Sequence, residues 1–231
     1  GTAADIKAVL KAVANGGIKL AADVNIAPTD TISAADANTF FLAAPTGTLT
    51  ATVTAGSASA LNKALKDLPA TEKDALTLTV TGATATTADL TALTTKTSEP
   101  VDASAVKTIT GSLSDLGTFY TLGATEIVLN ASSNATISGT VAVADLATLE
   151  NLLLSVPGKV TATVTPSTAT ALATALAANG KPTDALTFNV VEDRLAGAVV
   201  ATDAAHLITL DNQTSVKVKV DATQIEGTYA Q

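Results

Sequence analysis

The chain contains no cysteine, no methionine and no tryptophan. Without cysteine, disulfide bonds and thiolate metal sites are excluded, so stability has to come from packing and backbone hydrogen bonds. Cysteine and methionine are also the most readily oxidised residues, and a sequence without either suits an extracellular environment. Aromatic residues make up only 3% of the chain. A core of Ala, Val and Leu favours thin, closely packed layers.

Positive charge is scarce, with 13 Lys and Arg against 21 Asp and Glu, a formal net charge of -8. Such a chain repels phosphate groups, which argues against a nucleic-acid partner. No apolar run approaches the roughly 18 to 20 residues that span a bilayer, so we expect no transmembrane segment. The opening "GTAADIKAVLK" lacks the pattern of a signal peptide, so any secretion signal would lie outside this sequence.

A long internal repeat is the main feature of the sequence. The stretch "GTLTATVTAGSASALNKAL" at 47–65 returns as "GKVTATVTPSTATALATAL" at 158–176, with a constant offset of 158 − 47 = 111. Upstream, residues 18–36 resemble residues 126–145. These matches predict two copies of a unit of roughly 110 to 120 residues.

Further matches lie downstream of this stretch. "DALTLTV" at Asp74 returns as "DALTFNV" at Asp184, and "VDASAV" at Val101 returns as "VDATQI" at Val220. We therefore predict a first copy over 1–111 and a second copy over 112–231.

Within each copy, strand-like runs rich in Val, Ile, Thr and Leu alternate with helix-like runs rich in Ala and Leu. Regular alternation favours right-handed crossovers and a mainly parallel sheet. We predict an α/β fold, a solenoid of strand-helix repeats, with a two-layer α/β sandwich as the alternative. The predicted strands are 18–26, 48–54, 76–81, 105–110, 125–130, 136–142, 159–165, 186–191 and 215–220. The predicted helices are 3–14, 34–43, 57–67, 86–95, 112–121, 144–154, 168–178 and 202–207, with N-caps at Ser33, Ser57, Thr86, Ser112, Thr168 and Thr202.

The segment "VDASAVKTITGSLSDLGTFYTLGATEIVLNASSNATISGTVAVADLATLENLL" at 101–154 resembles repeats of very large cell-surface proteins of marine cyanobacteria. The resemblance rests on Asp102 to Ser104, Ile109 to Gly111, Tyr120 and Ile127 to Leu129. It implies secretion, a place on the cell surface, and a structural or motility-related role without an active site.

The two ends of the chain match one internal joint of the repeat. Internally, "VDASAVKTITG" is followed by the helix "SLSDLGTFYTL", whereas the last residues are "VDATQIEGTYAQ" and the first are "TAADIKAVLKAV". Another copy could follow without a break. We expect the partners of this chain to be copies of itself or adjacent repeats of a longer chain.

Candidate chemistry is sparse. A Ser-His-Asp site would have to use His206, the single histidine, with Asp203 or Asp211 to orient it. No G-x-S-x-G motif is present, and the corresponding "TADLTAL" of the first copy has no histidine. We predict a surface or helix-terminal histidine and no enzyme.

Several aspartates begin predicted helices, where a carboxylate stabilises the helix dipole; they are Asp36, Asp89, Asp145 and Asp203. No cofactor is expected. Calcium remains conceivable because oxygen ligands are available. Asp102 and Asp221, matched by the repeat, are the first candidate ligands.

Threonine occupies every second position of "TLTATVT" and of "TATVT", so its hydroxyls project from one face of each strand. The candidate binding face consists of Thr48, Thr50, Thr52, Thr54, Thr161, Thr163 and Thr165. It suits ice, calcium or glycan binding, or it is a solvated strand face with Val and Ala turned inward.

Together these patterns predict a secreted structural repeat protein. It would extend a surface layer, a filament or a giant surface protein by stacking end to end. The alternative is a binding module that uses the Thr-rich face.

Overall fold

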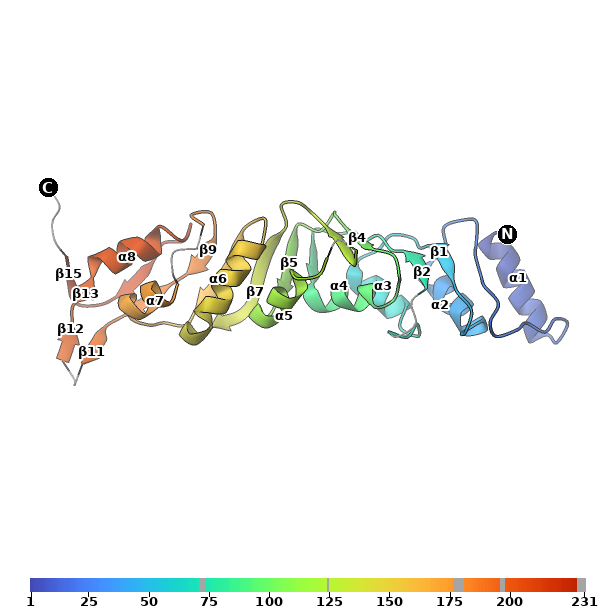
Figure 1. Ribbon diagram of the computed structural model, residues 1–231, viewed down its shortest axis with the longest axis horizontal. Helices are drawn as coiled ribbons and strands as arrows, with labels where there is room; N and C mark the ends of the chain where they lie inside the picture. The colour runs from blue at the N-terminus through green and yellow to red at the C-terminus, as the bar shows by residue number, and fades with distance from the viewer. Residues whose placement is uncertain (71–73, 124, 177–180, 196–197, 228–231) are drawn as a thin grey trace. The chain divides into compact units, whose positions relative to one another are not determined.

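The computed structural model describes residues 1–70, 74–123, 125–176, 181–195 and 198–227 (Figure 1). The chain forms two compact units, the first from Gly1–Lys107 and Leu122–Asn130, and the second from Thr108–Thr121 and Ala131–Gln231. The division into 1–111 and 112–231 rests on sequence similarity rather than on compactness, and it remains a prediction.

The helices begin close to where the sequence predicts them. They are α1 Ala3–Ala14, α2 Ala34–Ala43, α3 Ala58–Ala64, α4 Thr87–Thr94, α5 Leu113–Phe119, the 3-10 turn η1 Val143–Asp145, α6 Leu146–Ser155, α7 Ala169–Ala175 and α8 Ala204–Asp211. Five of the six predicted N-caps are confirmed, each accepting a hydrogen bond from the N–H three residues on: Ser33, Ser57, Thr86, Ser112 and Thr168. The sixth is wrong, because Asp203 rather than Thr202 caps α8. Part of the predicted helix 168–178 lies outside the described residues.

The strands are short. They are β1 Thr50–Thr52, β2 Ala75–Thr77, β3 Thr84–Thr86, β4 Val101–Ala103, β5 Thr108–Gly111, β6 Ile127–Leu129, β7 Asn134–Val141, β8 Val160–Val164, β9 Ala185–Thr187, β10 Asn189–Val191, β11 Asp193–Leu195, β12 Ala198–Val200, β13 Thr202–Asp203, β14 Lys219–Asp221 and β15 Ile225–Glu226. Most pair in parallel within several small sheets, and β11 with β12 is an antiparallel pair. The chain is thus a mixed α/β protein with mostly parallel strands.

In the first unit, extended segments pair in parallel with segments that follow 21 to 26 residues later in the chain. The pairs Ile26↔Leu49, Ile32↔Val53, Thr50↔Ala75, Gly56↔Val80, Asp74↔Thr97, Thr79↔Asp102 and Val101↔Ile127 join residues that are 23, 21, 25, 24, 23, 23 and 26 apart. Each step spans one paired segment and the chain that leads to its partner. We call such a stretch of chain a coil.

The second unit repeats this step. The pairs Thr108↔Asn134, Ala135↔Val160, Thr161↔Ala185, Ser167↔Val190 and Thr202↔Ile225 join residues 26, 25, 24, 23 and 23 apart. The step from β10 to β14 is longer, 219 − 189 = 30. The antiparallel pair β11–β12 lies in that connection and accounts for the extra residues.

Several helices that follow one another in the chain pack side by side. Within the first unit α2 contacts α3 and α3 contacts α4. Within the second unit α5 contacts α6 and α7 contacts α8, as the ribbon shows (Figure 1).

The buried side chains are small and aliphatic, as the composition predicts, with a few aromatic exceptions. Phe40, Phe119 and Phe188 are the largest fully buried residues. Phe188 matches Leu78 in the predicted sequence repeat (188 − 78 = 110), and both are fully buried.

One predicted strand is wrong. Residues 18–25 form no strand, and only Ile26 of the predicted strand 18–26 takes part in a bridge. The stretch that matches it in the sequence, 126–145, contains β6, which pairs with β4. A strand needs a neighbour that supplies its hydrogen bonds, so the same sequence pattern gives different structures in the two places.

Candidate functional site

The threonines of the candidate face in the first unit are exposed. Thr48, Thr50, Thr52 and Thr54 are exposed, while the alternate residues Leu49, Ala51 and Val53 are buried. Thr52 lies in register with the exposed Thr77 on the neighbouring strand. The Thr54 hydroxyl, by contrast, donates to the Ile32 carbonyl at 3.0 Å, which joins two coils.

In the second unit, Thr163 and Thr165 are exposed and Thr161 is half-buried. The parallel register places Thr140, Thr163 and Thr187 side by side on three strands, and all three are exposed. Thr165 donates to the Val141 carbonyl at 3.1 Å, as Thr54 does in the first unit. The face is therefore a partial grid of hydroxyls, and in each unit one threonine, Thr54 or Thr165, donates to a carbonyl of the preceding coil.

Asp102 lies in β4 and is half-buried, in register with Val128. Its carboxylate accepts the Ser104 N–H at 3.0 Å. Hydrogen bonds from the Ser104 hydroxyl and N–H hold the pKa of Asp102 below its ordinary value, although burial opposes them. The carboxylate already stabilises the turn that follows β4.

Asp221 lies at the end of β14, where it is exposed and accepts from the Lys219 ammonium at 2.7 Å. The strand register does not match it with Asp102. Thr79 pairs with Asp102, whereas Asn189, which corresponds to Thr79 (189 − 79 = 110), pairs with Lys219. The match between "VDASAV" and "VDATQI" is thus displaced by two residues from the structural register. Among the described residues, neither aspartate belongs to a group of three or more potential metal ligands.

His206 lies in the first turn of α8, half-buried. Its Nδ1 is 3.5 Å from the Asp203 carboxylate and 3.3 Å from the Thr170 hydroxyl on α7. Asp203 also accepts the Ala205 N–H at 2.8 Å as the helix cap. Asp211 is the last residue of the same helix. The contacts place His206 at the junction of two helices, with a threonine rather than a serine next to its ring.

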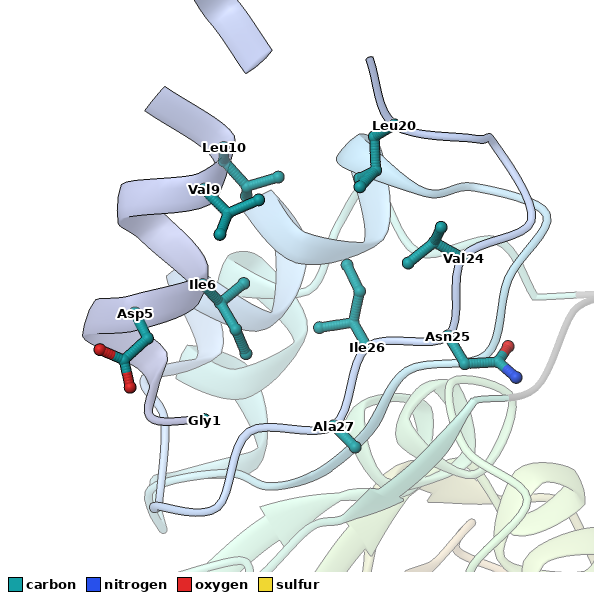
Figure 2. Close-up of a pocket in the computed structure, with 10 residues that line it drawn as sticks. All are labelled: Gly1, Asp5, Ile6, Val9, Leu10, Leu20, Val24, Asn25, Ile26 and Ala27. Carbon is teal, nitrogen blue, oxygen red and sulfur yellow. The ribbon is translucent and has the colours of Figure 1, made fainter. Parts of the chain in front are cut away.

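An apolar groove lies at the first coil, between α1 and the segment that follows it. It has a volume of about 430 Å³. Ile6, Val9 and Leu10 converge on Leu20 and Val24 (Figure 2). Its two polar lining side chains already make hydrogen bonds, because Asp5 Oδ2 accepts from the Thr2 N–H at 2.8 Å and Asn25 Oδ1 accepts from the Thr48 N–H at 2.9 Å. The groove offers apolar surface rather than chemistry.

The residue that matches Val9 in the predicted sequence repeat is buried. Thr2 and Asp5 of the α1 cap correspond to Ser112 and Asp115 of the α5 cap (112 − 2 = 110), so Val9 corresponds to Phe119. Val9 is 41% exposed, whereas Phe119 is 2% exposed.

A polar contact in the second copy replaces an apolar part of the groove. Leu10 corresponds to Tyr120 (120 − 10 = 110) and Val24 to Ser133 (133 − 24 = 109). The Tyr120 hydroxyl is 3.5 Å from the Ser133 hydroxyl. Tyr120 and Ser133 therefore make a contact at the position where Leu10 and Val24 line the groove.

Two pairs of buried polar residues bind consecutive coils together, and the sequence analysis did not identify them. Asp74 accepts the Leu49 N–H at 2.9 Å and Asp184 accepts the Val160 N–H at 2.8 Å. Both aspartates begin the matched stretch "DALT", and this match is the feature of the sequence that could have identified them.

Thr97 and Thr214 form the second pair. Thr97 accepts the Leu76 N–H and donates to the Leu76 carbonyl, and Thr214 does both with Leu186. A Thr-Ser dipeptide at 97–98 and 214–215 is the only sequence signal that they share.

No helix among the described residues is long and apolar enough to cross a membrane. The chain matches no protein-family model, no curated protein and no solved structure.

Proposed function

We propose that this chain is a structural repeat module, a strand-helix solenoid whose coils stack end to end to extend a filament, a surface layer or a giant cell-surface protein outside the cell. The observation that carries the proposal is the narrow range of the parallel pairing step, 21 to 26 residues for every parallel pair given above except β10 with β14. Repeats of this kind bury a continuous core only by stacking on neighbours.

The two-copy organisation is supported by hydrogen bonds that recur at the repeat distance. Asp74 and Asp184 (184 − 74 = 110) each accept from the strand one coil earlier. Thr54 and Thr165 (165 − 54 = 111) each donate to a carbonyl one coil earlier. A duplicated unit that keeps these links can be added without changing its neighbours' interfaces.

End-to-end stacking is supported by the apolar surface of the first and last described coils. Val9 and Ile18 are exposed on the first, and Ile208 and Ile225 on the last. Unpaired strand edges and apolar end surfaces promote association unless something covers them. We infer that the cover is another copy of this chain or an adjacent repeat of a longer one.

Negative-stain electron microscopy across a concentration series, with and without calcium, tests this function. Filaments or sheets with a repeat of one chain length are the expected result. A monodisperse monomer in light scattering at high concentration contradicts self-assembly of this chain.

The Thr-rich face favours a second function, a binding module. Thr140, Thr163 and Thr187 stand side by side, spaced by about 4.7–4.9 Å across strands. Such a flat hydroxyl grid suits ice, a glycan or, with carboxylates nearby, calcium. Thermal hysteresis above that of an albumin control would support ice binding, and melting that depends on calcium would support a metal-binding module.

A further inference from the structure

The first coil contains a segment that forms a strand in one copy of the repeat and not in the other. Ile18, Lys19 and Leu20 correspond to Ile127, Val128 and Leu129 (127 − 18 = 109). The later triplet is β6, which pairs in parallel with Val101–Ala103. The earlier triplet belongs to no strand. The difference between the two places is the neighbouring strand.

The isoleucine of this segment is buried where the segment forms a strand and exposed where it does not. Ile127 is 3% exposed beneath its partner strand, whereas Ile18 is 43% exposed. Val101, which pairs with Ile127, is fully buried, while Val220, its match in the sequence repeat, is only half-buried on β14. Each end of the chain thus presents one half of an apolar pair that is complete inside it.

We propose, on the basis of the stacking function above, that Val220–Ala222 of one copy adds as a parallel strand to Ile18–Leu20 of a second copy. The register is Val220 with Ile18, Asp221 with Lys19, and Ala222 with Leu20. In the internal pair the Val101 N–H donates to the Glu126 carbonyl at 3.0 Å. The corresponding bond runs from the Val220 N–H to the Gly17 carbonyl of the second copy.

The charges of Lys19, Lys219 and Asp221 favour this register over the one that is displaced by two residues. A register displaced by two residues keeps apolar side chains inward but places Lys219 opposite Lys19. Like charges directly opposite on paired strands destabilise the pair, whereas opposite charges stabilise it. The proposed register places the exposed Asp221 carboxylate opposite Lys19 and also uses the Val-Asp-Ala triplet that pairs with β6 inside the chain.

Disulfide trapping tests the register directly, because the natural chain has no cysteine. Residues paired across parallel strands are close enough for a disulfide, which needs Cα atoms roughly 4.4–6.8 Å apart. The double variant K19C/D221C, oxidised under mild conditions, should give a ladder of linked oligomers on a non-reducing gel. Each single variant should stop at a dimer, and K19C/K219C should cross-link much less.

Charge reversal provides an independent readout by sedimentation or light scattering. K19D and D221K should each weaken association by roughly two- to fivefold, and the K19D/D221K double variant should restore it. Efficient cross-linking of K19C/K219C, or tighter association of K19D, would overturn the proposed register. If filaments form but neither K19C/D221C nor K19C/K219C cross-links, the proposed strand pairing is wrong, whereas the proposed stacking function is not contradicted. A monomer at every concentration would refute both.

Discussion

The buried carboxylate of Asp184 accepts a hydrogen bond from the backbone N–H of Val160, 2.8 Å away and one coil earlier. Its second oxygen accepts the Lys181 N–H at 2.9 Å. Asp74 makes the corresponding link to Leu49 in the first copy. Each carboxylate thus accepts a hydrogen bond from a backbone N–H of the preceding coil, a group that needs a partner when it is buried.

Replacing Asp184 with Ala should therefore lower the free energy of unfolding by about 1.5–3 kcal/mol, the usual cost of losing a charge-assisted hydrogen bond. Asp74→Ala should have a similar effect. Asp184→Asn, which keeps one acceptor, should lose less. Urea unfolding measures each value, with the exposed Asp23→Ala as control, expected within about 0.5 kcal/mol of the natural chain. Equal stability of D184A and D23A would show that the link contributes nothing.

Gly158 allows a close approach of two coils. A Cβ at this position would lie 2.6 Å from the Ser133 carbonyl oxygen, and one at Gly47 would lie 2.1 Å from the Val24 carbonyl oxygen. Gly158→Ala and Gly47→Ala should each cost about 1–3 kcal/mol, because backbone has to move. Gly117→Ala on α5 is the matched control, since nothing lies near its Cβ and a helix prefers Ala by about 0.8–1 kcal/mol. Thermal melts should move down for the first two variants and up for the third.

Thr214 uses its hydroxyl both as acceptor from the Leu186 N–H at 2.9 Å and as donor to the Leu186 carbonyl at 2.7 Å. Thr214→Val preserves shape but leaves both buried groups without this partner, at a cost of about 1–3 kcal/mol each. Thr97→Val should behave alike. The exposed Thr187→Val, measured by the same denaturant titration, should change stability little. A neutral T214V would mean that water replaces the hydroxyl.

The burial of Tyr120 predicts that the free energy of unfolding falls at alkaline pH. Burial raises the pKa of its phenol, against a smaller opposing effect of the Ser133 hydroxyl. The folded-state pKa is therefore above the unfolded value of about 10, so this contribution is complete below pH 10 and is lost as pH rises through the folded pKa. Unfolding measured from pH 8 to 11 should show a steeper loss for the natural chain than for Tyr120→Phe. Parallel curves would contradict the assignment.

The alternation of strands and helices and most helix starts could be predicted from the sequence, because each depends on local pattern. Ser33 and Ser112 cap helices through bonds to residues three positions away. Thr50 and Thr52 face solvent while Ala51 faces the core, as a period of two requires.

Register and strand existence were decided only by the tertiary structure. "VDA" at Val220 matches "VDA" at Val101 by sequence, yet β14 places Lys219 where β4 places Asp102. Likewise, Ile18 to Leu20 has the pattern of a strand but lacks the neighbour that makes Ile127 to Leu129 one. Asp184 and Thr214 bind coils whose residues are more than twenty positions away. A local pattern sets which face of a segment is apolar, but pairing depends on which other segment lies beside it, and only the folded chain determines that.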